Sequence, residues 1–321
     1  MTRSFPLSRR AVVSALLLAA ALPLRAQEPA FTVLDFDWQD AERQRAVPVR
    51  LYLPRAASAA EPVPLVVFSH GIGGSRAGYS YLGQHWASQG FASLHLQHVG
   101  SDRSLWSAGT PWTLVGRLAL AAQDGEAIAR VHDLRFALDR VFQSSAAAQL
   151  DATRIVAAGH SYGANTTLLV AGAQVERQGQ VLDFRDPRIK AAIVISAPPF
   201  YGESSPQKIL SAVTVPSLHI TATEDVINIP GYFSGSADRV AVFDATGSTR
   251  KTLAVFEGGS HSMFTDRAGT GGAALNPQVK TATKELSLAF MRSVLGGDST
   301  ALIAWPQRFA SIVARYVGAG S

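Results

Sequence analysis

Residues 159–163 read Gly-His-Ser-Tyr-Gly and place one serine between two glycines. An apolar, strand-like run ends just before them at Ala158, and a helix-compatible apolar run resumes at Thr166. Glycines on both sides permit a sharp strand-to-helix turn, which pushes the middle side chain out at the edge of a sheet. The pattern predicts that Ser161 is a nucleophile for acyl transfer.

A serine hydroxyl is a weak nucleophile, so it needs a histidine within hydrogen-bond reach and a third group that orients the histidine. In the α/β-hydrolases, which use this turn, the acid and then the histidine follow the serine along the chain. Only His219 and His261 follow Ser161. His219 falls inside a strand-like segment, which is typical of a structural histidine. His261 lies in a glycine-flanked loop after the last predicted parallel strand, so we expect it to be the base.

The acid is expected in the loop that follows the strand-like segment 215–223. This loop offers Glu224 and Asp225. Asp225 is preferred because its setting resembles the acid loop of the α/β-hydrolases, and Glu224 is the alternative. Asp238 and Asp244 are interpreted as solvated surface carboxylates.

An acyl-transfer enzyme also needs two preorganised donors for the oxyanion that develops in the transition state. The residue after the nucleophile supplies one backbone N–H, which here belongs to Tyr162. The second is expected from the loop His-Gly-Ile-Gly-Gly at 70–74, and the amide of Ile72 is favoured. A competing interpretation makes residues 71–78, Gly-Ile-Gly-Gly-Ser-Arg-Ala-Gly, a phosphate-binding dinucleotide loop, but their spacing is not Gly-x-Gly-x-x-Gly.

The elements that must position these residues alternate between strand and helix. Near-continuous apolar strands separated by helices indicate a mostly parallel sheet covered by helices on both faces. Residues 27–321 are therefore expected to form a single α/β domain, and the serine turn resembles that of the α/β-hydrolase fold. Strands are expected at 47–54, 65–70, 91–98, 154–160, 189–197, 215–223 and 250–258, and helices at 78–89, 124–142, 161–172 and 279–294, the last of which closes the series.

Two stretches, 101–122 and 198–211, lie outside this alternation. Insertions after the strands of such a sheet lie at its carboxyl edge, where ligands bind. Both stretches are predicted to form walls of a substrate pocket, and extra packing is the alternative. The first contains Trp106 and Trp112.

The first 26 residues resemble an export signal. Arg9-Arg10 precedes a short apolar run that is too short for a good membrane span, and the paired arginines resemble a twin-arginine signal. Cleavage near Ala26 is expected, and an uncleaved N-terminal anchor is the alternative. The mature protein is then expected to be periplasmic or secreted, with no stable membrane span.

Composition excludes several classes of function. The chain has no cysteine, which rules out disulfides, a cysteine nucleophile and thiolate metal sites. The net charge of +5 arises largely from the four arginines in residues 1–26, where no acidic residue occurs. No basic run remains in residues 27–321, so a nucleic-acid partner is not expected.

At 67–102 and 157–164 the chain resembles the branch of α/β-hydrolases that contains platelet-activating-factor acetylhydrolases and predicted dienelactone hydrolases. The likeness extends from about Arg50 to His261 and is strongest in the Ser-His-Gly-x-Gly loop, the Gly-His-Ser-x-Gly turn and the His-x-Gly-Ser-Asp segment at 98–102. It implies a triad of Ser161, Asp225 and His261, oxyanion donors at Ile72 and Tyr162, and neither a metal nor an organic cofactor.

The resemblance implies an exported serine esterase that acts through an acyl-enzyme, on a small-molecule or lipid-like ester such as an acetyl ester. Dienelactone hydrolases use a cysteine nucleophile, which this chain lacks, so a serine esterase is favoured. The alternatives are an acyltransferase, a thioesterase or a polyesterase with the same triad, and a non-catalytic binding protein with this fold.

Overall fold

The computed structural model describes residues 1–2, 28–202, 205–229 and 231–318. The export signal expected at 1–26 therefore lies outside the described residues, apart from its first two. Within the described part, no helix is both long enough and apolar enough to cross a membrane.

A nine-stranded sheet organises the described residues. From edge to edge its order is β1 (Phe31–Asp40), β2 (Arg45–Pro54), β4 (Ala92–Leu96), β3 (Val63–Ser69), β5 (Leu150–His160), β8 (Ile189–Ile195), β9 (Ser217–Glu224), β10 (Lys251–Ser260) and β11 (Val313–Val317). The strands from β4 to β10 are parallel to their neighbours, and the pairs β1–β2, β2–β4 and β10–β11 are antiparallel. The prediction of a mostly parallel sheet is confirmed.

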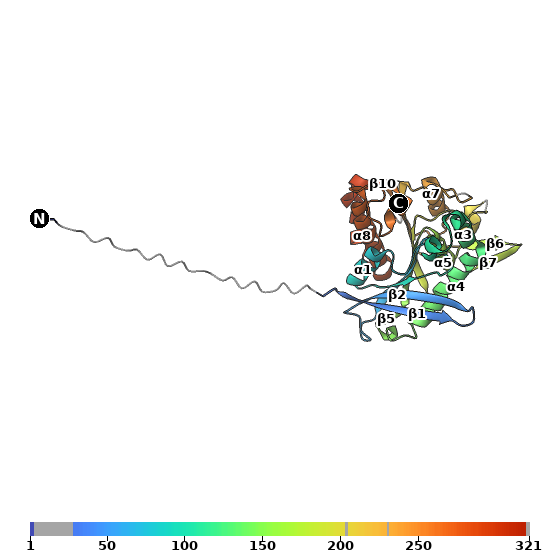
Figure 1. Ribbon diagram of the computed structural model, residues 1–321, viewed down its shortest axis with the longest axis horizontal. Coiled ribbons are helices and arrows are strands. Elements are labelled where there is room, and N and C mark those ends of the chain that lie inside the picture. Colours follow the sequence, from blue (N-terminus) through green and yellow to red (C-terminus); the bar gives the residue numbers. More distant parts are fainter. Residues whose placement is uncertain (3–27, 203–204, 230, 319–321) are drawn as a thin grey trace.

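Helices cover both faces of the sheet, as the apolar strands predict. Leu65 and Val67 of β3 pack with one face, whereas Val66 and Phe68 pack with the other, because successive side chains of a strand point to opposite sides. The first face is covered by α4 (Asp124–Val141), α5 (Tyr162–Ala171), α6 (Pro206–Leu210) and α7 (Ser236–Ala245), and the second by α1 (Ser80–Ser88), α8 (Leu275–Gly296) and α9 (Thr300–Arg308). Figure 1 shows α1 and α8 on one side of the sheet and α4 and α5 on the other.

Two further groups of elements lie outside the nine-stranded sheet. Stretch 101–122 forms α2 (Ser104–Ser107), the 3-10 turn η1 (Pro111–Thr113) and α3 (Leu114–Ala121). After α5, the strands β6 (Gln174–Arg177) and β7 (Gln180–Asp183) form a separate hairpin, which projects beside α3 and α5 in Figure 1. The short 3-10 turns η2 (Ala147–Gln149), η3 (His261–Phe264) and η4 (Ala310–Ile312) complete the described elements.

The prediction that a helix at 279–294 closes the series is wrong. Helix α9 follows it, and β11 then returns antiparallel to β10 at the edge of the sheet. The sequence pattern missed β11 because an edge strand is only half covered: Ala314 and Arg315 are exposed, so no continuous apolar run marks it. The first strand, β1, was missed for the same reason, since buried and exposed side chains alternate along it.

Candidate active site

The turn between β5 and α5 carries the serine. Ser161 has φ 55°, a left-handed conformation that is rare for a residue with a side chain. The glycines on either side are required by close backbone contacts: a Cβ at Gly159 would collide with the carbonyl of Gly163, and a Cβ at Gly163 would collide with the carbonyl of Ser69 at the end of β3. The strained backbone at Ser161 and the absence of side chains at the two glycines together hold the serine hydroxyl at the carboxyl edge of the sheet.

The structure brings Ser161, His261 and Asp225 together from three separate strand ends. His261 Nε2 lies 2.8 Å from Ser161 Oγ, and His261 Nδ1 lies 2.7 Å from Asp225 Oδ1. The Nδ1–H donates to the carboxylate, so Nε2 is left to accept the serine proton. The second carboxylate oxygen accepts from the hydroxyl of Thr221 at 2.7 Å. Asp225 is fully buried, whereas the neighbouring Glu224 is exposed, so of the two predicted acids the fold places Asp225 against the histidine.

The surroundings keep Asp225 ionised. Burial alone raises the pKa of this carboxyl, but the hydrogen bond and charge of His261 and the charge of Arg239 lower it further than burial raises it. The pKa therefore lies well below its usual range. Arg239 Nη2 lies 3.6 Å from Asp225 Oδ1, and both side chains are almost completely buried. A buried anion beside Nδ1 stabilises the positive charge that develops on the histidine when it takes a proton.

The two predicted oxyanion donors are Ile72, in the loop after β3, and Tyr162, at the start of α5. Tyr162 is the first residue of α5, where a backbone N–H has no intrahelical acceptor. In the loop after β3, the N–H of Gly73 donates to Ser101 O (2.8 Å) and that of Gly74 to Gly71 O (3.0 Å). Among the described residues, the N–H of Ile72 has no hydrogen-bond acceptor.

The same bonds argue against a phosphate-binding turn at 71–78. A phosphate-cradling loop presents several free backbone N–H groups. In this loop, three glycine N–H groups are already bonded within the protein: that of Gly71 donates to the hydroxyl of Tyr79 (3.2 Å), and those of Gly73 and Gly74 are paired with carbonyls.

A chain of hydrogen bonds connects this loop to the histidine. The hydroxyl of Tyr79 accepts from Gly71 N–H and donates to Nδ1 of His160 at 2.9 Å, and His160 Nε2–H donates to the carbonyl of His261 at 3.0 Å. Because a carbonyl only accepts, the proton of His160 must be on Nε2. Burial and the charge of His261 lower the pKa of His160 to about 3, so this ring stays neutral and the connection persists at ordinary pH.

Behind the loop lies a buried polar network centred on Arg130. Its guanidinium donates to the carbonyl of His70, to the hydroxyl of Ser101 (2.7 Å) and to the hydroxyl of Thr166 (3.0 Å), and it lies 4.6 Å from the ring centroid of Tyr162. Burial lowers the pKa of Arg130 to about 10, which still leaves it charged at neutral pH. The cation thus holds the carbonyl of His70, two residues before Ile72, and the first turn of α5, which begins at Tyr162.

The network also contains a second serine, histidine and aspartate in hydrogen-bond contact. His98 Nε2 lies 3.1 Å from Ser69 Oγ, and His98 Nδ1 lies 3.1 Å from Asp133 Oδ2. All three side chains are completely buried, so no substrate reaches them. Arg43 and Arg45 also donate to Asp133 and lock it in place, which marks the cluster as structural support.

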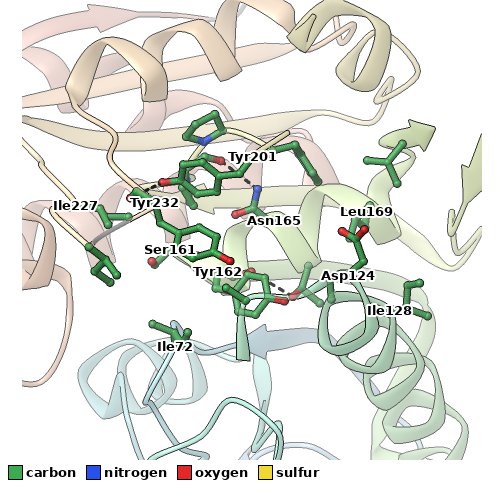
Figure 2. Close-up of a pocket in the computed structure, with 18 of the residues that line it drawn as sticks. Ile72, Asp124, Ile128, Ser161, Tyr162, Asn165, Leu169, Tyr201, Ile227 and Tyr232 are labelled. Atoms are coloured by element: carbon green, nitrogen blue, oxygen red, sulfur yellow. Dashed lines mark hydrogen bonds between the residues drawn. The ribbon is translucent and has the colours of Figure 1, made fainter. Parts of the chain in front are cut away.

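An apolar cavity opens beside Ser161. Figure 2 shows Ser161 and Ile72 on one side of it and Leu169, Ile128 and Asp124 on the other. Both stretches predicted as pocket walls line it, the first through Leu118 and Ala122 and the second through residues 198–201. A second cleft on the other side of Ser161 is lined by His261, Trp106 and Arg267. Trp112, in contrast, is almost fully exposed and lines neither space.

Sequence reasoning missed Tyr79, Arg130 and Arg239. No local pattern marks them, because each acts on a segment far away in the chain. His160 lies inside the Gly-His-Ser-Tyr-Gly motif, but its hydrogen-bond partners do not.

His219 is buried, and its Nε2 lies 3.2 Å from Ser217 Oγ, as expected of a structural histidine. Asp238 differs from the prediction of a solvated carboxylate, since it accepts from the N–H of Gly235 at the start of α7.

The part of the chain that the structure describes contains no group of three His, Cys, Asp or Glu side chains arranged to hold a metal ion. Organic cofactors are not required by a serine, histidine and aspartate in this arrangement. The site can transfer a proton from serine to histidine and stabilise an oxyanion with groups of the protein alone.

The strand order, the helices on both faces and the strained serine turn define the class: the protein has the α/β-hydrolase fold. The family model "Platelet-activating factor acetylhydrolase, isoform II" matches residues 45–109, so the predicted resemblance is confirmed over this segment. No curated protein matches the chain. Among solved structures, a ferulic acid esterase from Streptomyces cinnamoneus superposes with a TM-score of 0.60 at 22% identity, covering 86% of this chain and 93% of the esterase.

Proposed function

We propose that the protein is a serine hydrolase that cleaves carboxylic esters through an acyl-enzyme. One observation carries the proposal: His261 lies within hydrogen-bond distance of both Ser161 Oγ (2.8 Å) and the buried carboxylate of Asp225 (2.7 Å). Nucleophile, base and orienting acid are the three groups that this chemistry needs. The similarity to an acetylhydrolase family model and to a solved esterase supports the same class of reaction.

In the proposed reaction, Ser161 Oγ attacks the ester carbonyl while its proton passes to His261 Nε2. The carbonyl oxygen becomes an oxyanion that accepts from the backbone N–H groups of Ile72 and Tyr162. When the tetrahedral intermediate collapses, the C–O bond to the alcohol breaks and His261 returns the proton to the leaving oxygen. A water molecule then repeats the sequence on the acyl-enzyme, which releases the acid and restores Ser161.

The test uses the purified residues 27–321 with p-nitrophenyl acetate and a fluorophosphonate probe. The wild-type protein hydrolyses the ester and is labelled at Ser161, and Ser161→Ala abolishes both. Ser88→Ala is the matched control, because this serine lies at the exposed end of α1 and bonds only to His85 O. Hydrolysis or labelling that survives in Ser161→Ala would overturn the proposal, as would a wild-type protein that shows neither. Adding a competing alcohol distinguishes hydrolysis from acyl transfer, since a transferase yields the new ester.

The proposed location of the enzyme is the periplasm or the exterior of a bacterial cell, and its proposed substrates are lipid-like or acetyl esters. The basis for export is the paired Arg9-Arg10 ahead of the apolar run, and the basis for the substrate class is the apolar character of the cavity beside Ser161. Replacing both arginines with lysine is expected to leave the protein in the cytoplasm with an uncleaved N-terminus. Normal export and cleavage of this variant would exclude the twin-arginine route.

A further inference from the structure

We propose that the apolar cavity beside Ser161 is a channel with a second opening under the β6–β7 hairpin, so that the enzyme accepts acyl chains longer than the cavity itself. This inference rests on the proposed esterase function and names its substrate class: esters of long, linear, mainly apolar acids.

The position of His261 decides which part of the ester enters the cavity. His261 gives its proton to the leaving alcohol, so the alcohol must lie on the side of the histidine. His261 lines the cleft that contains Trp106 and Arg267, and it does not line the apolar cavity. Ser161 borders both spaces. The alcohol therefore occupies the cleft, and the acyl group occupies the apolar cavity.

The cavity runs along one side of α5. Ser161, Asn165 and Leu169 all line it and are four residues apart, so they lie on one face of the helix. At 1.5 Å per residue, this face extends roughly 12 Å from the nucleophile to Leu169. The opposite walls are apolar as well, with Ile128 from α4 and Phe200 from the segment after β8. An acyl chain of about octanoyl length fills this distance.

The cavity shares part of its lining with a neighbouring groove. Six residues border both the cavity and an open polar groove next to the β6–β7 hairpin: Ala122, Asp124, Val175, Arg177, Tyr201 and Tyr232. The groove continues past the hairpin turn at Gly179 to Lys208. An ion pair between Arg177 Nε and Asp124 Oδ2 (2.7 Å) borders the opening, and the carboxylate side of this pair is mostly exposed to solvent. An acyl chain that leaves the cavity between these shared residues therefore reaches the open groove.

The first experiment compares p-nitrophenyl acetate, octanoate and palmitate at one fixed detergent concentration. A blind cavity rejects each methylene that does not fit, at a cost that reaches roughly tenfold or more in kcat/KM for a single group. A channel predicts that the palmitate ester retains kcat/KM within about tenfold of the octanoate ester. Loss of palmitate hydrolysis with octanoate hydrolysis intact would overturn the channel. Failure with all three esters, acetate included, would instead refute the esterase function.

The second experiment plugs the opening. Ala122→Phe introduces a ring where the cavity meets the groove, just after the end of α3. It is expected to lower kcat/KM for palmitate by about tenfold or more and to leave that for acetate within about twofold. Ala148→Phe, on an exposed residue before β5, is the matched control and changes neither. An equal loss for acetate and palmitate in Ala122→Phe, or no loss for either, would contradict a second opening at this position.

Discussion

Mild acid is expected to unfold this protein, because most of its histidines are buried and neutral. Five of its eight histidines are buried, and burial lowers the pKa of each, to about 3 or 4 for four of them and well below the usual value for the fifth: His70, His95, His98, His160 and His219. In the unfolded chain each binds a proton near pH 6.5. The unfolded state therefore binds more protons than the folded state at every pH between about 4 and 6.5.

The sign and size of the effect follow from this difference in proton binding. The free energy of unfolding has its full value above about pH 6.5. It falls as the pH decreases, by up to about 1.4 kcal/mol per histidine per pH unit. For five histidines the free energy of unfolding drops by about 6 kcal/mol between pH 7 and pH 5.5. Domains are stable by only about 5–15 kcal/mol, so unfolding near pH 5 is expected. The ionised buried carboxylates do not counteract this, since the pKa of Asp133 is about 2 and that of Asp225 is lower still.

Urea unfolding followed by circular dichroism between pH 7 and pH 5 measures this dependence directly. His219→Gln keeps a polar group near Ser217 and lies outside the site. This variant should reduce the slope of the free energy of unfolding against pH by the equivalent of one proton. His132→Gln is the control, because this histidine is only partly buried and should change the slope less. A free energy of unfolding that stays constant from pH 7 to pH 5 would refute the assignment of these rings as buried and neutral.

Three further substitutions test the site. Asp225→Asn should lower kcat by about 10⁴-fold with the fold retained, whereas Glu224→Gln should leave kcat unchanged. The reverse result in an ester assay would show that Glu224, and not Asp225, is the acid. Gly163→Ala should prevent folding or abolish activity, because its Cβ would collide with the end of β3, and a folded, active variant seen by circular dichroism and ester hydrolysis would contradict the close approach. Tyr79→Phe removes the hydroxyl between the oxyanion loop and His160, and it should lower kcat with little change in KM, since the groups that it connects act in the transition state. An unchanged kcat would show that this connection is not needed for catalysis.

Much of the architecture was predictable because its signals are local. The apolar runs that became β3, β5, β8 and β9 are buried on both faces, which leaves a continuous pattern in the sequence. The turn at Ser161 was predictable for a similar reason, since a strand, two glycines and a helix follow one another within a few residues. The order of acid and histidine along the chain then restricted the partners to a small number of candidates.

The edge elements were not predictable in this way. Strands β1 and β11 have one neighbour each in the sheet, and their side chains alternate between cover and solvent, so their hydrophobic signal is weak. The β6–β7 hairpin is similarly exposed, although it borders the end of the cavity. Elements with little buried surface leave little trace in the sequence.

By itself, the sequence determined that a serine stands in a strained turn between a strand and a helix, and that His261 follows the last parallel strand. Only the tertiary structure decided that Asp225 and not Glu224 contacts the histidine, that Tyr79 bonds to His160, and that the β6–β7 hairpin lines the cavity beside Ser161. The physical reason is that hydrogen bonds and cavity walls form between segments far apart in the chain. Their geometry depends on strand register and helix packing, which no local pattern of residues encodes.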